Sequence, residues 1–418
     1  MKIIFVLILA LAAWVVVAQP RAGGSGAVPR EVWFHAEITL RPAANGQKAW
    51  ILPFDVVSVS SSEEARPAFF VVNGLERLPL SYTGSTPEGY ERYEIPYFQG
   101  ELIWRKEGRQ LAGFWMRPDR GTQYELVLSP GKLARFALNE APVKQFLLEE
   151  RYALVQYEPG SPAEKGRRAI AALTEHSDGT VTGSIMTESG DYRYLAGNRS
   201  GNRIHLSTFN GIFAYVFELE LTENGGMQGR QLLNGSSELA LSGRVDLTAK
   251  LADPTGITGM KPGVKQLVFS LPHYKTGELL GPDLGRPAVI QIMGSWCPNC
   301  LDESVAFKQF QAAFPEVQFF GIAFERSSER EEAFAAVDKF VRGLDLRYPV
   351  LFAGRAASGA VEKVLEGLVG FQSYPTTIYL DRQGEVRKIY SGFYGPGTPE
   401  YEPWLQETLA FIEKLQSE

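Results

Sequence analysis

The sequence predicts a multidomain protein in which an α/β domain follows an all-β region. The first part of the 418-residue chain has short apolar runs separated by Gly, Pro, Asn and Ser, a pattern typical of antiparallel strands. From about Val264 apolar runs alternate with segments of helical periodicity, which indicates an α/β layer. The length also suits about three domains.

The first 18 residues have the pattern of a secretory signal peptide. Lys2 precedes an apolar stretch from Ile3 to Ala18, which is short for a membrane span, and small residues precede the predicted cleavage point. We expect export to the periplasm with cleavage after about Ala18, and an uncleaved inner-membrane anchor is the alternative. Residues 19–30 are predicted to form a linker.

The β-rich region is predicted to form one or two antiparallel barrels or sandwiches, which we divide into residues 31–145 and a barrel-like module at 146–250. The pairs Asp178-Gly179 and Asn234-Gly235 favour hairpin turns. The candidate strands are 33–40, 49–59, 68–72, 90–96, 100–105, 111–116, 124–128, 152–157, 169–174, 179–186, 192–197, 203–208, 214–221, 227–233 and 238–245.

Residues 251–263, rich in Gly and Pro, are predicted to form a second linker, and residues 264–418 the α/β domain. The expected strands there are 266–270, 288–293, 317–325, 349–353, 376–381 and 385–390. The expected helices are 298–313, 329–341, 360–368 and a last one from Pro403.

Composition limits the partners of the chain. Without residues 1–18 it has 41 basic and 48 acidic residues, a net charge of −7, and no basic stripe. Nucleic acid and anionic membrane surfaces are therefore not expected as partners, and membrane contact is not required. The aromatic side chains of the β region are expected in its core rather than on a binding surface. They include Trp104, Phe114, Trp115, Tyr215 and Phe217.

Both cysteines of the chain lie in the sequence Trp296-Cys297-Pro298-Asn299-Cys300, between a predicted strand and a predicted helix. Two thiols at this spacing can close a disulfide or open to a dithiol. At a helix N-terminus, free N–H groups and the helix dipole favour a thiolate, so the pKa of Cys297 is expected below its usual value of about 8.5. Cys300 would then attack a mixed disulfide formed at Cys297.

Other roles for this pair are less favoured. A structural disulfide would close only a small loop and would stabilise the fold little. An inert thiol pair is disfavoured because Pro298 suits the first position of a helix. Zinc would need four ligands, and the histidines are distant in sequence, so no metal and no cofactor are expected. The histidines are His35, His176, His205 and His273.

The cysteine motif, together with the Ser-Tyr-Pro-Thr-Thr segment at 373–377, resembles the TlpA/ResA-like thiol-disulfide oxidoreductases of the thioredoxin superfamily. The resemblance covers about residues 265–418. It implies a thioredoxin-like fold, a cis peptide bond before Pro375, protein thiol or disulfide substrates and an upstream membrane electron donor. The implied substrate-binding residues are Trp296, Pro298, Tyr374, Pro375 and Thr376.

Three further positions separate branches of that superfamily. Thioredoxins proper have a buried aspartate where this chain has Gln291, which cannot ionise. The ResA-like branch has a catalytic-site glutamate where this chain has Glu303, one helical turn after Cys300, and such a carboxylate would raise the thiol pKa and exchange protons. A solvated Glu303 on the helix surface is the alternative. The peroxidase branch has Thr or Ser where this chain has Gly294.

The segment from Gly183 to Gly197, followed by residues 206–211, resembles a β module of Bacteroidetes-type TlpA-like proteins. We expect this module to space or dock the redox domain, and binding of a partner protein or an apolar ligand is the alternative. The predicted function is that of an exported thiol-disulfide oxidoreductase that acts as a reductase. A binding or scaffold protein and a thiol-dependent peroxidase are the competing predictions.

Overall fold

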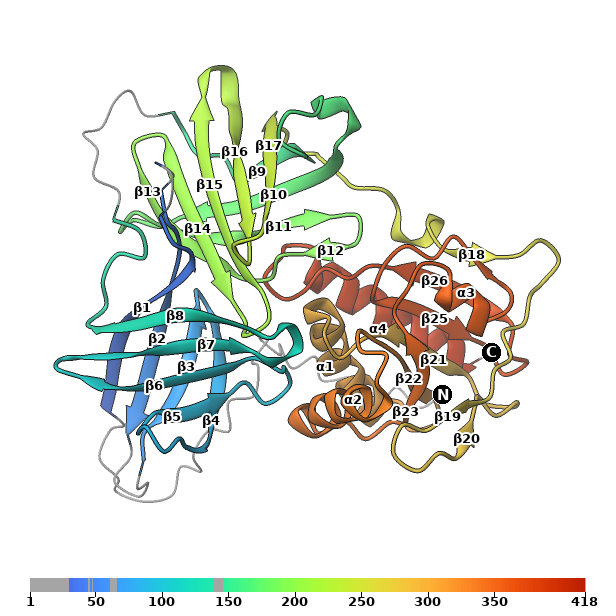
Figure 1. Cartoon of the computed structure of the whole chain (residues 1–418). Coiled ribbons are helices and arrows are strands. Elements are labelled where there is room, and N and C mark those ends of the chain that lie inside the picture. Colours follow the sequence, from blue (N-terminus) through green and yellow to red (C-terminus); the bar gives the residue numbers. More distant parts are fainter. Residues whose placement is uncertain (1–29, 44–45, 47, 61–65, 138–145, 418) are drawn as a thin grey trace, which may run out of the picture.

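The computed structural model describes residues 30–43, 46, 48–60, 66–137 and 146–417. Two antiparallel β units and one α/β unit follow each other along the chain (Figure 1). The predicted signal peptide at 1–18 and the linker at 19–29 lie outside the described residues, and Arg30 already belongs to the first strand.

The first unit, barrel 1, is a closed ring of eight antiparallel strands, because β8 pairs back with β1. Closure leaves no sheet edge open to other chains. Alternate residues of β1, among them Ala36 and Ile38, are buried inside it with Phe54 and Trp115. Its strands are β1 (Arg30–Arg41), β2 (Trp50–Ser60), β3 (Ala68–Asn73), β4 (Glu76–Ser85), β5 (Glu91–Glu94), β6 (Glu101–Glu107), β7 (Gln110–Arg117) and β8 (Thr122–Pro130).

Strand β4 was not predicted. It contains Pro79, a residue that weakens a strand pattern, and it is interrupted by a register shift between Tyr82 and Gly84. Pairing with β3 and β5 nevertheless holds it in the ring, since Pro79 lies opposite Phe70. Pairing with its two sequence neighbours therefore overrides the weak strand signal of β4.

The second unit, barrel 2, is also closed, because β10 pairs with both β9 and β11. The short strand β12 adds to β11 and extends toward the α/β domain (Figure 1). Its strands are β9 (Arg151–Tyr157), β10 (Arg167–Glu175), β11 (Thr180–Thr187), β12 (Gly190–Asp191), β13 (Leu195–Ser200), β14 (Arg203–Phe209), β15 (Ala214–Thr222), β16 (Gly226–Leu233) and β17 (Ser237–Val245).

The third unit has a five-stranded mixed sheet in the order β23-β22-β21-β25-β26, which agrees with the predicted α/β layer. Strands β21, β22 and β23 are parallel, β25 is antiparallel to β21, and β26 is antiparallel to β25, so only β25 runs against the other four. The sheet strands are β21 (Ala288–Met293), β22 (Gln318–Glu325), β23 (Val350–Arg355), β25 (Thr376–Leu380) and β26 (Val386–Ser391). The helices are α1 (Pro298–Ala313), α2 (Arg330–Leu344), α3 (Ala360–Val364) and α4 (Tyr401–Ser417).

Short elements complete the described fold. The two-residue strands are β18 (Gly259–Met260), β19 (Leu271–Pro272), β20 (Leu279–Leu280) and β24 (Leu368–Val369). The 3₁₀ turns are η1 (Pro118–Arg120), η2 (Ala163–Lys165), η3 (Glu223–Gly225) and η4 (Pro254–Gly256).

Two predicted elements of the α/β domain are wrong. The strand expected at 266–270 is reduced to one bridge, between Gln266 and Glu385, because the backbone hydrogen bonds to the segment before β26 end at Leu267. The helix expected at 360–368 ends at Val364, and β24 follows after Gly367, whose φ of +119° a helix does not accommodate.

The predicted linker at 251–263 is packed against the α/β domain. Thr258 is buried and shares a hydrogen bond of 2.7 Å with the Ser391 hydroxyl, and β18 pairs with β24. This segment is therefore part of the folded structure of the last domain.

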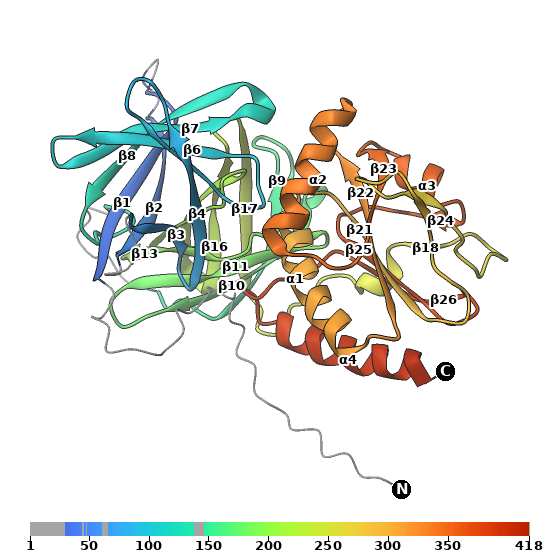
Figure 2. The same cartoon turned by 90° about the horizontal axis from the view of Figure 1, so that it is seen from below.

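The three domains meet around α1. Figure 2 shows α1 and α2 between the two barrels and the mixed sheet. One apolar cluster runs without a break from Trp115 in barrel 1 through Phe209 in barrel 2 to Phe310 on α1. A shared core of this kind favours a fixed arrangement of the domains over independent motion.

The contact between the two barrels leaves no room for a larger residue at Gly100. A Cβ atom there would lie 1.8 Å from the Gly211 carbonyl oxygen, which itself accepts a hydrogen bond of 2.9 Å from the Trp115 indole. We expect Gly100→Ala to lower the free energy of unfolding by about 1–3 kcal/mol, because backbone must shift to admit the methyl group.

Thermal unfolding followed by circular dichroism tests this. Gly256→Ala is the matched control, because a Cβ atom at Gly256 meets nothing within 4 Å. Equal melting temperatures for the two variants would contradict the described contact between the barrels.

Candidate active site

The cysteine pair is joined as a disulfide at the start of α1. Cys297 is the N-cap residue, Pro298 is the first helical residue, and the Cys297 sulfur accepts a hydrogen bond of 3.2 Å from the Cys300 N–H. Cys300 is fully buried, whereas Cys297 keeps 4% of its surface exposed. The first sulfur thus has access to the outside and the second lies behind it, as nucleophilic and resolving roles require.

The proline loop before β25 lies against the disulfide. The Tyr374–Pro375 peptide bond is cis, in agreement with the sequence prediction, and the Tyr374 carbonyl oxygen lies 3.5 Å from the Cys297 sulfur. The Tyr374 ring also meets the Trp296 ring edge to face, with centroids 5.4 Å apart. Loop and cysteine motif therefore form one surface.

Not every predicted contact residue reaches that surface. Trp296, Pro298 and Tyr374 line a cavity at the disulfide, but Pro375 and Thr376 are buried. Thr376 begins β25, where ladders to β21 and β26 hold it, and its hydroxyl donates 2.8 Å to the Ser373 carbonyl. The predicted contact of Thr376 with substrate stays a prediction, and in this structure its side chain lies inside the sheet.

Glu303 is buried under α1, so the alternative of a solvated glutamate is wrong. Its carboxyl accepts hydrogen bonds of 2.7 Å from the Thr377 hydroxyl and 2.9 Å from the Gln291 side chain. The same Gln291 amide donates 3.0 Å to the Cys300 carbonyl. Burial raises the pKa of Glu303 to about 7, which makes it a proton donor and acceptor near neutral pH, one turn from Cys300.

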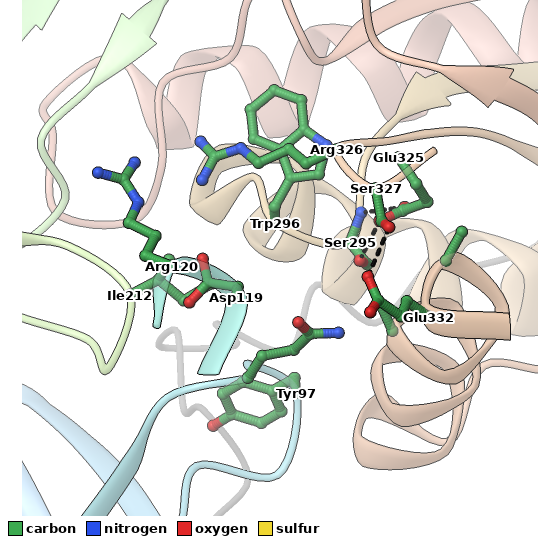
Figure 3. A pocket seen from close by; sticks show the side chains of 13 residues that line it. Tyr97, Asp119, Arg120, Ile212, Ser295, Trp296, Glu325, Arg326, Ser327 and Glu332 are labelled. Carbon is green, nitrogen blue, oxygen red and sulfur yellow. Dashed lines mark hydrogen bonds between the residues drawn. The ribbon is translucent and has the colours of Figure 1, made fainter. Parts of the chain in front are cut away.

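A second buried carboxyl supports the segment before the motif. Glu325, at the end of β22, accepts hydrogen bonds from the Ser295 N–H and hydroxyl at 2.8 and 2.7 Å, and burial raises its pKa to about 7. The neighbouring Arg326 places its guanidinium 4.4 Å from the centre of the Trp296 ring. Figure 3 shows these groups around a cavity of about 220 Å³ to which all three domains contribute.

Barrel 2 forms a wall of the active site. Asp191 on β12 is buried and accepts hydrogen bonds from the Asn299 amide at 3.1 Å and from the Gly395 N–H. Burial raises the pKa of Asp191 to about 7. Since Asn299 lies between the two cysteines in sequence, a side chain of barrel 2 directly contacts the redox motif.

A buried ion cluster joins the three domains next to this wall. The Arg193 guanidinium of barrel 2 donates two hydrogen bonds of 2.8 Å to Asp302 on α1 and lies 2.7 Å from the Glu76 carboxylate of barrel 1. All three side chains are at least 93% buried. Burial raises the pKa of Asp302 and of Glu76, and the Arg193 charge opposes both shifts.

These contacts enclose a cavity of about 330 Å³ with Cys297 in its lining. The α/β domain contributes the cysteine motif and Tyr374, and barrel 2 contributes Phe213 and Tyr215. The prediction that the aromatic residues of the β region belong to the core is confirmed for Trp104, Trp115 and Phe217, which are fully buried; Phe114 and Tyr215 are half-buried, and Tyr215 both packs against the core of barrel 2 and lines this cavity. Residues of barrel 2 thus line the cavity beside Cys297.

Sequence reasoning missed the residues contributed by barrel 2 and β22. Asp191 and Arg193 stand among polar residues of a β-rich segment, where charges usually face solvent. The backbone of Arg193 is unusual, with φ +57°, but the amino-acid sequence around Arg193 does not predict this conformation. Nothing in the sequence links these residues to α1, because Arg193 and Asp302 are 109 positions apart.

The described geometry defines a dithiol-disulfide centre at a helix N-terminus. The comparisons agree with that class. The chain is 24% identical over 143 residues to sporulation thiol-disulfide oxidoreductase A of Bacillus subtilis (strain 168), across 34% of this chain and 79% of that protein. No protein-family profile matches the chain.

Two solved structures illustrate the structural similarities. A DsbF homologue from Corynebacterium diphtheriae is 18% identical, with a TM-score of 0.30, across 40% of this chain and 99% of that one. A secreted disulfide oxidoreductase of Mycobacterium tuberculosis, homologous to DsbE of E. coli, is 23% identical, with a TM-score of 0.26. The match covers 34% of this chain and 95% of that one.

The sequence match and the cysteine pair together support a general thiol-disulfide oxidoreductase function. Among the described residues, no helix has the length and apolar character needed to cross a membrane. Within the same residues, no group of three or more His, Cys, Asp or Glu side chains is arranged to hold a metal ion.

The raised pKa of Glu303 predicts a pH dependence of stability. In the unfolded chain a glutamate ionises near pH 4.5, whereas in the folded protein Glu303 keeps its proton to about pH 7. The folded state therefore binds one more proton between these values, and its stability falls as the pH rises from 4.5 to 7, by up to about 3 kcal/mol for this group.

Urea unfolding of the oxidised protein at pH 5 and pH 8 measures this loss. We expect Glu303→Gln to lose less stability between the two pH values than the wild type, because glutamine does not ionise. Glu413→Gln, an exposed position on α4, is the control and should behave as the wild type. The prediction fails if Glu303→Gln keeps the full wild-type pH dependence.

Proposed function

We propose that the protein is an exported, TlpA/ResA-like thiol-disulfide oxidoreductase that reduces disulfides of protein substrates. The observation that carries the proposal is the Cys297–Cys300 disulfide, with Cys297 lining a cavity at the N-terminus of α1 and Cys300 buried behind it. No metal or organic cofactor is needed for this chemistry.

The reaction begins with the reduced protein. The Cys297 thiolate attacks one sulfur of the substrate disulfide, a mixed disulfide forms, and the other substrate sulfur leaves as a thiolate that takes up a proton. Cys300 then loses its proton and attacks the Cys297 sulfur, which releases the second substrate thiol and closes the Cys297–Cys300 disulfide. Two electrons have passed to the substrate, and an upstream dithiol at the membrane restores the reduced state.

The surrounding residues assist both steps. The N–H groups of the first turn of α1 and its dipole stabilise the thiolate of Cys297. Glu303 lies one turn from Cys300 on α1 and shares the Gln291 amide with the Cys300 backbone carbonyl; in this proposal it accepts the proton that the Cys300 thiol loses. Trp296 and Tyr374 form the side of the cavity on which substrate lies.

Export to the periplasm is supported by the apolar segment from Ile3 to Ala18 and by the similarity to a secreted oxidoreductase. An oxidising compartment also suits a chain whose two cysteines both belong to one redox pair. Mass spectrometry of the mature N-terminus, expected near Gln19, identifies the processed form.

Substitution of each cysteine separates the two steps. We expect Cys297→Ser to abolish disulfide exchange, because the nucleophile is lost, and Cys300→Ser to accumulate mixed disulfides, because the resolving thiol is absent. Non-reducing electrophoresis after reaction with a disulfide-containing protein measures both results. Substantial turnover by Cys297→Ser would contradict the assignment of Cys297 as the nucleophile. Rapid consumption of hydrogen peroxide by the wild type would favour a peroxidase instead.

The reduction potential of the pair tests the direction of electron flow. A reductase is expected to have a potential near or below about −230 mV, in the range of thioredoxin-like couples, whereas an oxidant of substrate thiols lies near about −120 mV. Equilibration in graded thiol/disulfide buffers, followed by alkylation with a mass tag and mass spectrometry, gives the value. A potential near −120 mV would refute the reductase direction.

A further inference from the structure

The wall that barrel 2 forms beside Cys297 is closely fitted to the α/β domain. A Cβ atom at Gly190 on β12 would lie 3.0 Å from the Asn299 side chain, and one at Gly392 would lie 3.1 Å from the Glu188 carbonyl oxygen. A Cβ atom at Gly397 would lie 3.0 Å from the Arg193 carbonyl oxygen. Backbone therefore approaches backbone across this interface, with little space for the surfaces to slide past each other.

Buried ion pairs also stabilise this interface. Breaking the Arg193–Asp302 pair by moving the domains apart would leave ions unpaired inside the protein until water reached them, which is costly. The Glu76 carboxylate of barrel 1 binds the same guanidinium, so this ion cluster includes residues of all three domains. The wall is thus held in place next to Cys297.

Little of Cys297 is accessible. The cavity beside it has a volume of about 330 Å³, at the lower end of the range of small-molecule sites, and 4% of Cys297 is exposed. Its lining includes aromatic rings from both domains, Phe213 and Tyr215 from barrel 2 and Trp296 and Tyr374 from the α/β domain. Because barrel 2 stands beside this sulfur, we expect the bulk of a folded domain to meet barrel 2 before its surface disulfide reaches Cys297.

We propose that barrel 2 determines the substrate class: the cavity admits a disulfide carried by an extended polypeptide segment and excludes a disulfide on a folded surface. This inference rests on the proposed function. A single extended chain is slender enough to enter between the walls, and the rings of Phe213, Tyr215 and Trp296 can pack against the residues next to its cysteine. The protein would then act on chains before they fold.

Two disulfide-linked substrates with the same local sequence test the proposal. One is a dimer of a ten-residue peptide joined through its cysteine, and the other is a dimer of a small folded domain joined through a surface cysteine in that sequence. Reduction of both by dithiothreitol corrects for their intrinsic reactivity. We expect the wild-type protein to reduce the peptide dimer at least about tenfold faster than the folded dimer after this correction.

Variants test whether the ion cluster of Arg193, Asp302 and Glu76 causes the preference for the peptide dimer. Arg193→Gln combined with Asp302→Asn and Glu76→Gln removes all three charges of the ion cluster, avoiding the larger cost of a buried unpaired charge, and should bring the two rates together. Lys339→Gln is the matched control, because the Lys339–Glu94 pair of 2.5 Å also joins α2 to barrel 1 but lies outside the cavity lining. It should keep the wild-type ratio.

A second measurement on the reduced wild type needs no variant. Iodoacetamide should alkylate Cys297 readily, and a maleimide carrying a 5-kDa polyethylene glycol should react at least about tenfold more slowly than it does with a free cysteine peptide.

Equal corrected rates on peptide and folded dimers would overturn the proposal while leaving the redox function intact. Faster reduction of glutathione disulfide than of the peptide dimer would also overturn it, in favour of a small-molecule substrate. Reaction with none of these disulfides would refute the proposed function itself.

Discussion

The buried ion cluster of Arg193, Asp302 and Glu76 is the interaction on which the arrangement of this protein depends. Each charge would be expensive to bury alone; Arg193 is tolerated because its two carboxylate partners come from the other two domains, and each carboxylate is tolerated because Arg193 faces it. The cluster therefore stabilises the assembled chain only. Because Asp302 follows Cys300 by two residues on α1, the same interaction that unites the domains also fixes the first turn of the redox helix.

The two faces of α1 serve different purposes. The face toward the sheet carries Cys300 and Glu303, which share the Gln291 side chain of β21 as a hydrogen-bonding partner. The face toward barrel 2 carries Asn299 and Asp302, which bind Asp191 and Arg193. Under the proposed function, proton exchange would take place on one side of the helix and substrate selection on the other, so the β region would influence substrate choice without contributing to the chemistry.

Local signals in the sequence predicted much of this structure. Alternation of apolar and polar residues identified most strands of both barrels, and the cysteine motif between an apolar run and a helical segment located the redox centre. Prediction failed for β4, because Pro79 and a register shift weaken its strand pattern although its partners β3 and β5 are neighbours in the chain. It failed for Asp191 and Arg193 for a different reason, since only the folded chain brings them to α1. The place of Glu303 was predicted from a resemblance, but its burial depends on Gln291 and Thr377.

The segment at 251–263 shows how domain boundaries and folding units differ. It was expected to be a free connection, yet β18 pairs with β24 and Thr258 bonds to Ser391, so this segment covers part of the α/β domain. A fragment that starts at Val264 would lack that cover and would also expose Asp302 without Arg193. The α/β domain thus depends on the rest of the chain for part of its own surface, and separating it from the barrels would require that surface to be rebuilt with polar residues.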